Sequence, residues 1–342
     1  MKQYLRYVGK RLLQAIPLLL AVTVVVFVIV HSLPGDPAVT YAGVLATEGQ
    51  LESIRRRMGW DRPLPVQYVI YMRNLMQGDL GISLFSSSPV LEDIKNKFPA
   101  TLELILYSIT VALTLGVPLG MLTAAKGEGV LDWLADKLTF VYSLLAGALP
   151  DFWWALMLVY VLFYRLRVAP PPMGRISVLV EAPRTITGMY VVDSLLTLNW
   201  TALKSSLSQL ALPVGTLSFF VLGPVMKITR ESVNEALNSN YVRFARQCGL
   251  SGWRVAMYAL RNALTTVITV IGIFLAYLIG AAVLIENVFA WGGLGQYAVA
   301  SVINSDYFAI QGVILVMAAY SLVVYLLVDL LYAAVDPRVT LG

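Results

Sequence analysis

Charged residues are scarce in this sequence. Of its 342 residues, 13% are Asp, Glu, Lys or Arg, whereas soluble domains usually carry roughly 25%. Hydrophobic residues make up 58% of the chain, and its mean hydropathy is +0.74. The low charge and the high hydropathy together exclude an ordinary soluble domain and predict an integral membrane protein.

Cysteine and histidine each occur once, as Cys248 and His31. A single cysteine excludes a disulfide within the chain, and a single histidine all but excludes a metal site built from histidines. The net charge is +5, yet the basic residues are spread over the polar segments and form no stripe. That distribution is typical of membrane topology and argues against nucleic-acid binding.

The motifs of several enzyme classes are missing as well. The sequence has no G-x-x-x-x-G-K-[ST], so it lacks the usual loop that cradles ATP phosphates. It has neither G-x-S-x-G nor H-E-x-x-H, and a serine hydrolase triad would need His31 as its base. We therefore predict a protein that is not an enzyme, with no catalytic, cofactor-binding or metal-binding residue. Active transport would then draw its energy from a docked ATPase chain or from an ion gradient.

Six long apolar runs predict six membrane-spanning helices, since one crossing needs about 20 residues. The first run follows a basic N-terminal segment, and the HSLPGDP after it is not a cleavage site. We therefore expect an uncleaved helix with a cytoplasmic N-terminus, and a structural role for His31 at its edge. The predicted spans are residues 12–30, 101–125, 138–164, 207–229, 265–285 and 307–335.

Basic residues in the loops predict which side of the membrane each loop faces. With both termini in the cytoplasm, the inner segments hold 13 Lys and Arg residues and the outer segments hold 12. Long loops are exempt from the positive-inside rule, and without the long first outer loop the comparison becomes 13 against 5. This supports six spans with both termini inside. A five-span arrangement, with residues 12–30 outside the helical bundle, is equally consistent with this count of basic residues.

A polar segment, residues 33–97, follows the first span and predicts a small extracytoplasmic subdomain. Its Pro- and Gly-containing stretches indicate turns, and the run around Arg55–Arg57 predicts a short amphipathic helix that ends at Gly59. Residues 1–32 are the predicted cytoplasmic N-terminal segment with the first span, and residues 98–335 the core membrane domain. Residues 336–342 are the predicted cytoplasmic tail.

Asp151 lies within the third predicted span, directly after Pro150. A proline costs a helix interior about 3 kcal/mol, so a kink is expected there. An ionisable group within a span normally faces a cavity or the bundle interior. Asp151, with its neighbours Trp153 and Trp154, is therefore our candidate for the lining of a transport pathway. The alternative is that Asp151 caps the helix at the kink.

Residues 240–264 interrupt the apolar pattern between the fourth and fifth spans. Ala245 and Gly249 are four residues apart and would share one face of a helix, where small residues allow close approach of a partner. Gly249 also favours a helix end, and Ser251 can cap the next helix. We therefore predict two short helices with a bend, lying against the membrane and presenting a small-residue face to a partner.

Four arginines and no acidic residue occupy residues 240–264, namely Arg243, Arg246, Arg254 and Arg261. Within this segment Arg243-Phe244-Ala245, followed after three residues by Gly249, resembles the EAA loop of ATP-binding-cassette (ABC) importer permeases. The usual first residue of that motif is Glu, and Arg243 replaces it here, a departure that is also common among peptide permeases. A basic amphipathic loop lying on anionic lipid is the alternative.

Longer strings resemble the dipeptide/oligopeptide permease subfamily of ABC importers. They are LPGDP (33–37), DRPLPVQY (61–68), GDLGIS (78–83), ENVFAWGGLG (286–295) and DPR (336–338). The resemblance covers nearly the whole chain and implies an all-α integral membrane fold, the type I ABC importer transmembrane domain. It also implies a location in the cytoplasmic membrane of a prokaryote.

The resemblance implies partners and a mechanism. A second, homologous permease subunit would share the pathway, two ATPase subunits would bind ATP and Mg²⁺, and an extracytoplasmic solute-binding protein would land on residues 33–97 and 286–305. In the family the EAA loop is the coupling helix that docks into a groove of the ATPase. The resemblance therefore implies ATPase-coupling roles for Tyr241, Arg243, Phe244, Ala245, Arg246 and Gly249.

The substrate and the transporter class each have alternatives. Similar permeases handle di- and oligopeptides, nickel chelates, glutathione or oligosaccharides, and a peptide is our expectation. A secondary transporter or channel without an ATPase would usually show internal repeats and buried charges near the membrane midplane. We find no repeat, and Asp151 is the single charged candidate near a midplane. A membrane scaffold protein is a third hypothesis.

Overall fold

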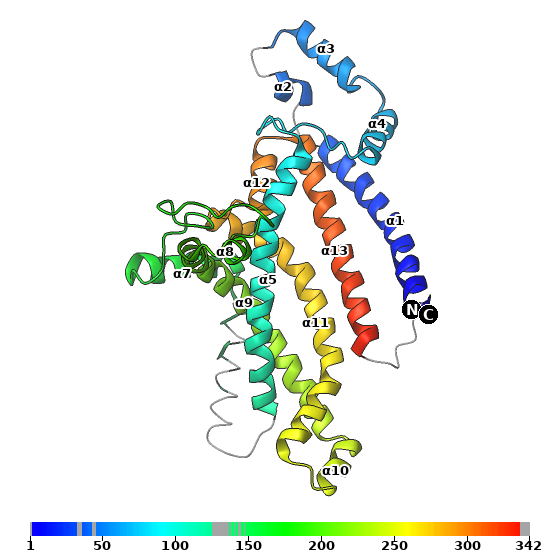
Figure 1. Cartoon of the computed structure of the whole chain (residues 1–342). Coiled ribbons are helices and arrows are strands. Elements are labelled where there is room, and N and C mark those ends of the chain that lie inside the picture. Colours follow the sequence, from blue (N-terminus) through cyan, green and yellow to red (C-terminus); the bar gives the residue numbers. More distant parts are fainter. Residues whose placement is uncertain are drawn as a thin grey trace. The chain divides into compact units, whose positions relative to one another are not determined.

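The computed structural model of the chain describes residues 2–32, 36–42, 46–124, 137, 139, 141–142, 145–146 and 148–335 (Figure 1). Helices dominate these residues, which contain no named strand and one isolated β-bridge, between Ile82 and Pro89. The predicted all-α class is therefore confirmed. The chain divides into two compact units, Met1–Ala100 with Gly292–Leu322 and Thr101–Trp291 with Val323–Gly342. Each is described by itself.

The first unit contains one long apolar helix, α1 (Lys2–His31), and a set of shorter helices. The shorter ones are α2 (Pro37–Ala42), α3 (Glu48–Met58), α4 (Leu64–Met76) and α12 (Leu294–Ile303). The N-terminal part of α5 (Val90–Ala124) and most of α13 (Tyr307–Val335) also belong to it. Helix α3 ends at Gly59, whose φ of 73° is left-handed and whose N–H bonds back to the helix, as the sequence predicts.

Apolar clusters hold the first unit together. Val90 and Ile94 of α5 pack with Leu294, Ala309 and Val313, and this contact joins α5 to α12 and α13. A second cluster joins α1 to α13 through Val26, Val30, Tyr307 and Ile310. The residues of both clusters are buried, so the start of α13 is fixed from two sides.

The second unit is built around two long helices, α9 (Trp200–Leu237) and α11 (Gly252–Val288), which lie side by side with the short α10 (Asn240–Gln247) at their turn (Figure 1). The short helices α7 (Asp151–Leu158) and α8 (Tyr190–Leu196) and the π-helix η1 (Val159–Arg165) complete it. Glycines permit close packing here: a Cβ on Gly116 or Gly120 of α5 would meet Val225 or Thr229 of α9 at under 3.0 Å.

Five of the described helices are long and apolar enough to cross a membrane. They are Tyr7–His31, Val90–Ala124, Trp200–Leu237, Gly252–Val288 and Tyr307–Leu331. They correspond to five of the six predicted spans. Much of the first half of the remaining one, residues 138–164, lies outside the described residues, so the sixth span stays a prediction. In the part of this span that is described, the helix is interrupted at Leu149 and Pro150 and resumes at Asp151, where a kink was predicted.

Two boundaries differ from the sequence prediction. The stretch between the predicted spans 265–285 and 307–335 is partly helical, because α11 continues through Val288 and residues 294–303 form α12. Helices α9 and α11 are also longer than the predicted spans, because their polar ends remain helical beyond the apolar cores. Residues 126–136, between the second and third predicted spans, lie outside the described residues, as do residues 33–35 of LPGDP, the DPR string and the predicted tail 336–342.

Candidate functional site

Helix α10 is the centre of the predicted coupling segment, and its end has a specific backbone geometry. Gly249 has a φ of +77°, a left-handed conformation that glycine adopts without a side-chain clash. Its N–H donates to Arg246 O at 3.0 Å, while Leu250 N–H donates to Ala245 O at 3.3 Å. These two bonds form a Schellman motif, which stops the helix and turns the chain. The predicted stop at Gly249 is therefore confirmed.

The same geometry corrects two details of the prediction. Because α10 ends at Gln247, Gly249 lies beyond the helix and does not share a helical face with the half-buried Ala245. The second of the two predicted short helices is in fact the start of the 37-residue α11. Ser251 occupies the N-cap position of α11 as predicted, but its side chain makes no capping hydrogen bond.

The side chains of α10 point mostly outward. Val242 is fully buried, whereas Tyr241 is 45% exposed and Phe244 is 67% exposed. Arg243 and Arg246 are exposed beside these aromatic rings. Tyr and Arg are enriched in the cores of protein interfaces, so α10 presents the residue types of a docking surface.

The charge around α10 is uncompensated within the described part of the chain. Arg254 and Arg261, on the first turns of α11, are exposed like Arg243 and Arg246. None of the four forms an ion pair with another residue that the structure describes. The surface is therefore electrostatically suited to an acidic partner.

Asp151 begins α7 and is bonded to α11. Tyr277 Oη donates to Asp151 Oδ2 at 2.6 Å, and no hydrogen bond from a described α7 backbone group to this carboxylate accompanies it. The capping alternative thus receives no support. Trp153 is exposed, while Trp154 packs against Phe219 with ring centroids 5.1 Å apart. The structure brings the three predicted pathway residues together on one helix turn.

Trp154 also lines a cavity between the α7–η1 segment and α9. The cavity has a volume of about 540 Å³ and apolar walls that include Leu158, Leu212 and Phe219. The indole Nε1 of Trp154 is buried and has no hydrogen-bond partner among the described residues. A buried N–H of this kind costs free energy unless a ligand or a water molecule accepts a hydrogen bond from it.

A buried ion pair in the second unit was not singled out from the sequence. Arg175 Nη2 donates to Glu103 Oε2 at 2.6 Å, with side-chain exposures of 10% and 1%. The guanidinium also lies 3.8 Å from the centroid of the Tyr190 ring, and Glu103 Oε1 accepts from Val191 N–H at 2.8 Å. This clamp, Glu103 with Arg175, Tyr190 and Val191, fastens the segment before α8 to α5. The isolated Glu103 in an apolar run was the available signal.

The GDLGIS string forms a joint with the start of α13. Asp306 is fully buried and accepts from Ser83 Oγ at 2.6 Å, from Phe85 N–H at 3.2 Å and from Ala309 N–H at 3.2 Å. Gly81, with a φ of +83°, packs so closely on the Phe308 ring that a Cβ would lie 2.5 Å from it. The string is therefore needed for the structure of this joint, which we call the Asp306 joint.

The DRPLPVQY string fixes the start of α4 to α1. Gln67 Nε2 donates to the carbonyl oxygens of Trp60 and Arg62 at 3.2 and 2.7 Å. The ring nitrogens of His31 lie 2.8 Å from Phe27 O and 3.1 Å from Gln67 Oε1. His31 therefore links α1 to α4, in keeping with the structural role expected for it.

Asp36, the described acidic residue of LPGDP, is anchored to α3. Arg55 Nε donates to Asp36 Oδ2 at 3.1 Å, and Ala38 N–H donates to Oδ1 at 2.9 Å. Burial raises the pKa of Asp36, but the hydrogen bonds from Arg55 and Ala38 outweigh this effect and hold the pKa below its ordinary value. Asp36 thus remains ionised and paired at neutral pH.

Known proteins resemble this chain along nearly its whole length. Residues 116–341 match the family described as binding-protein-dependent transport system inner membrane component, and residues 4–105 match the N-terminal region of such membrane components. The probable D,D-dipeptide transport system permease protein of Escherichia coli K12 is 40% identical over 94% of this chain and 93% of its own length.

Two further relatives are dipeptide transport system permease proteins. The one from Alkalihalophilus pseudofirmus is 36% identical over 98% of this chain and 99% of the relative, and the one from Escherichia coli K12 is 34% identical over 98% of both. These matches, together with the five apolar helices, show that the chain belongs to the family of binding-protein-dependent transport system inner membrane components, the multi-pass transmembrane domains of type I ABC importers.

Proposed function

We propose that this chain is one of two homologous permease subunits of an ATP-driven importer for di- and oligopeptides. Support for a peptide substrate comes from the three relatives, each named for dipeptide transport. Nickel chelates, glutathione and oligosaccharides remain alternatives, because permeases of the same architecture carry them. The chain itself would not hydrolyse ATP; two partner ATPase subunits would bind ATP and Mg²⁺.

The observation that carries the proposal is the uncovered surface of α10. An eight-residue helix at the turn between two long apolar helices exposes two aromatic rings beside two arginines. The chain supplies no acidic residue in residues 240–264 to neutralise them. We infer that α10 docks in a groove of an ATPase subunit, with Phe244 and Tyr241 in the groove and Arg243 and Arg246 against acidic residues at its rim.

Helix α10 would act as a lever because it is short and firmly joined at both ends. The Schellman motif at Gly249 fixes its angle to α11, and Asn238 and Ser239 are bonded to the last turn of α9. When ATP brings the ATPase subunits together, α10 would move as a rigid piece and carry the α9–α11 pair with it. Coupling then arises from the different affinity of the ATPase pair for the inward-facing and outward-facing permease.

The other assignments follow from the same proposal. Both termini would lie in the cytoplasm, and residues 33–97 with 286–305 would receive the extracytoplasmic binding protein. Asp151, with Trp153 and Trp154, would line the pathway, where its carboxylate could pair with the ammonium group of a passing peptide. The hydrogen bond from Tyr277 holds that carboxylate at the start of α7.

Substitution of Gly249 tests the coupling. Gly249→Trp should uncouple ATP hydrolysis from peptide uptake, because it places a large ring on the exposed stop of α10, where a Cβ meets nothing within 4 Å. Gly249→Ala is the matched control, since it adds the same backbone strain of about 1 kcal/mol without the bulk. Uptake and ATPase activity are measured on the complete transporter in proteoliposomes.

Two outcomes would contradict these proposals. If Gly249→Trp imports peptide normally with the ATPase bound, the coupling role of this segment is wrong. If the chain purified with its natural neighbours brings no nucleotide-hydrolysing subunit into contact with residues 240–264, the importer proposal itself fails. A secondary carrier would show that outcome together with uptake that depends on an ion gradient.

A further inference from the structure

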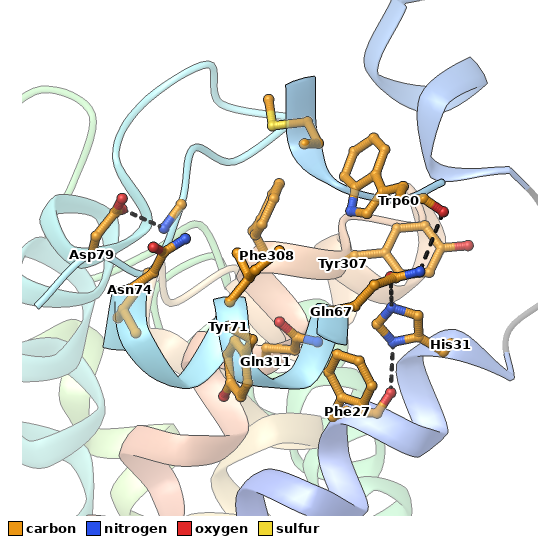
Figure 2. A pocket seen from close by; sticks show the side chains of 14 residues that line it. Phe27, His31, Trp60, Gln67, Tyr71, Asn74, Asp79, Tyr307, Phe308 and Gln311 are labelled. Carbon is orange, nitrogen blue, oxygen red and sulfur yellow. Dashed lines mark hydrogen bonds between the residues drawn. The ribbon is translucent and has the colours of Figure 1, made fainter. Parts of the chain in front are cut away.

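A separate cavity lies inside the first unit, between α1, α4, the GDLGIS string and the start of α13 (Figure 2). Its volume is about 160 Å³, close to that of engineered apolar cavities of about 150 Å³ that bind benzene. Five Phe, Tyr and Trp side chains are among its lining residues, and Figure 2 shows Phe308 between Asp79 on one side and Trp60 on the other. The cavity therefore has room for one ring-sized molecule.

Gln311 supplies a polar side chain to the wall of this cavity. Gln311 is 6% exposed and lines the cavity beside Tyr71 and Phe27. Its amide can donate two hydrogen bonds and accept others, yet no hydrogen bond joins its side chain to any residue that the structure describes. Gln67, which lines the same cavity, donates to two carbonyl oxygens. The amide atoms of Gln311 are not among the buried polar atoms that lack a partner, so they are open to the cavity and can bond to water or to a ligand there.

The charge of the lining favours a cation. Asp79 is exposed at the rim, and its Oδ1 accepts from Gly81 N–H at 2.8 Å, which leaves the carboxylate able to accept further donors. No Lys or Arg lines the cavity. Both ring nitrogens of His31 lie against oxygen atoms of Phe27 and Gln67, so they are not directed to a ligand. Aromatic walls add a further preference for cations.

We propose that this cavity binds a small organic ammonium compound with a ring-sized apolar body and a second hydrogen-bonding group. The ammonium group lies at the carboxylate of Asp79, the body lies against Trp60, Tyr71 and Phe308, and the second group bonds to the amide of Gln311. This site is separate from α10 and from Asp151, and its ligand binding does not depend on the proposed transport function.

Tyramine is a suitable probe because its ammonium and hydroxyl groups stand at opposite ends of one ring. Phenethylamine lacks the hydroxyl, 4-ethylphenol lacks the ammonium, and 3-(4-hydroxyphenyl)propionate replaces the ammonium with a carboxylate. Binding is measured by calorimetry on the complete transporter in lipid nanodiscs, with empty nanodiscs as the reference for partition into lipid. We expect tyramine to bind about tenfold more tightly than 4-ethylphenol and about fivefold more tightly than phenethylamine, with the carboxylate weakest.

Two variants assign the contacts. Asp79→Asn keeps an acceptor for Gly81 N–H but removes the charge, so it should erase the difference between tyramine and 4-ethylphenol. Gln311→Leu should erase the difference between tyramine and phenethylamine while leaving phenethylamine binding unchanged. The matched controls Asp61→Asn and Gln77→Leu, at exposed positions outside the cavity, should leave all four affinities unchanged.

Each alternative outcome overturns the proposal. Equal binding of the four probes by the unmodified protein, or no binding of tyramine, shows that the cavity does not select an ammonium compound. This comparison needs no variant and therefore holds even if a variant fails to fold. If either affinity difference survives its variant, the corresponding contact is wrong.

Discussion

The polar side chains of the Asp306 joint and of helix α10 have opposite environments. At the joint the carboxylate of Asp306 is fully buried and accepts hydrogen bonds from Ser83, Phe85 and Ala309. On α10 the side chains around Val242 are exposed, and its arginines have no ion-pair partner among the described residues. The joint is complete within the chain, whereas α10 has the surface of a segment that is completed by a partner.

The sequence strings that resemble permeases therefore fall into two classes, one with a structural role inside the chain and one that faces outward. GDLGIS, DRPLPVQY and the described part of LPGDP supply side chains or glycines that close turns and link helices within the first unit. The EAA-like segment contributes a stop at Gly249 but otherwise faces outward. We therefore expect substitutions in the first class to change stability, and substitutions in α10 to change partner binding.

The largest effect on stability is expected at the Glu103–Arg175 clamp. Glu103→Ala should lower the free energy of unfolding by about 3–5 kcal/mol, because it leaves the buried guanidinium of Arg175 without its counterion. Unfolding is followed by titration with SDS in mixed micelles. The double variant Glu103→Ala, Arg175→Met should regain part of the loss, since the unpaired charge is then gone. Equal stability of Glu103→Ala and the parent chain would show that the clamp does not hold the structure.

A smaller loss is expected at the Asp306 joint. Asp306→Ala should cost about 2 kcal/mol, because the hydroxyl of Ser83 and the N–H of Phe85 lose their buried acceptor. Asp306→Asn keeps one carbonyl acceptor and should cost less than half as much in the same titration. Asp61→Ala, at an exposed position, is the control and should stay within about 0.5 kcal/mol of the parent. An Asp306→Ala protein as stable as this control would contradict the structural role of the joint.

Local sequence signals predicted much of this fold. Long apolar runs located the five described spans, and glycine at Gly59 and Gly249 predicted two helix ends, because left-handed backbone favours that residue. Residues 294–303 were missed because this helix is too short for a span and follows a Gly-rich turn. The continuity of α11 from Gly252 was missed because charged residues in its first turns resemble a loop.

Side-chain pairs far apart in the sequence could not be predicted in this way. Glu103 and Arg175 are separated by 72 positions, and Ser83 and Asp306 by 223. Neither pair has a periodicity or a motif that relates its members. The place of Gln311 in a cavity wall is likewise visible only once α1, α4 and α13 are placed around it.

The smallest effect on stability is expected for a substitution on α10. This substitution also tests most directly whether α10 and the Asp306 joint differ as described. Phe244→Ala should leave the free energy of unfolding within about 0.5 kcal/mol of the parent, because this ring is already 67% exposed. Its affinity for the proposed ATPase should nevertheless fall at least about tenfold, as for aromatic residues at the centre of an interface. Phe85→Ala is the matched control, since Phe85 is a 60% exposed phenylalanine in the first unit.

Docking of the ATPase on α10 can be measured by labelling Cys248. This residue is the single cysteine of the chain and is exposed at the end of α10, so no label site has to be added. A maleimide should modify it readily in the isolated chain and slowly when the ATPase covers α10. Phe244→Ala should restore fast labelling at ATPase concentrations that still protect the parent and Phe85→Ala. If Phe244→Ala destabilises the chain as much as Asp306→Ala does, then α10 is a structural joint like that of Asp306. If labelling is equally fast with and without the ATPase, the ATPase does not cover α10.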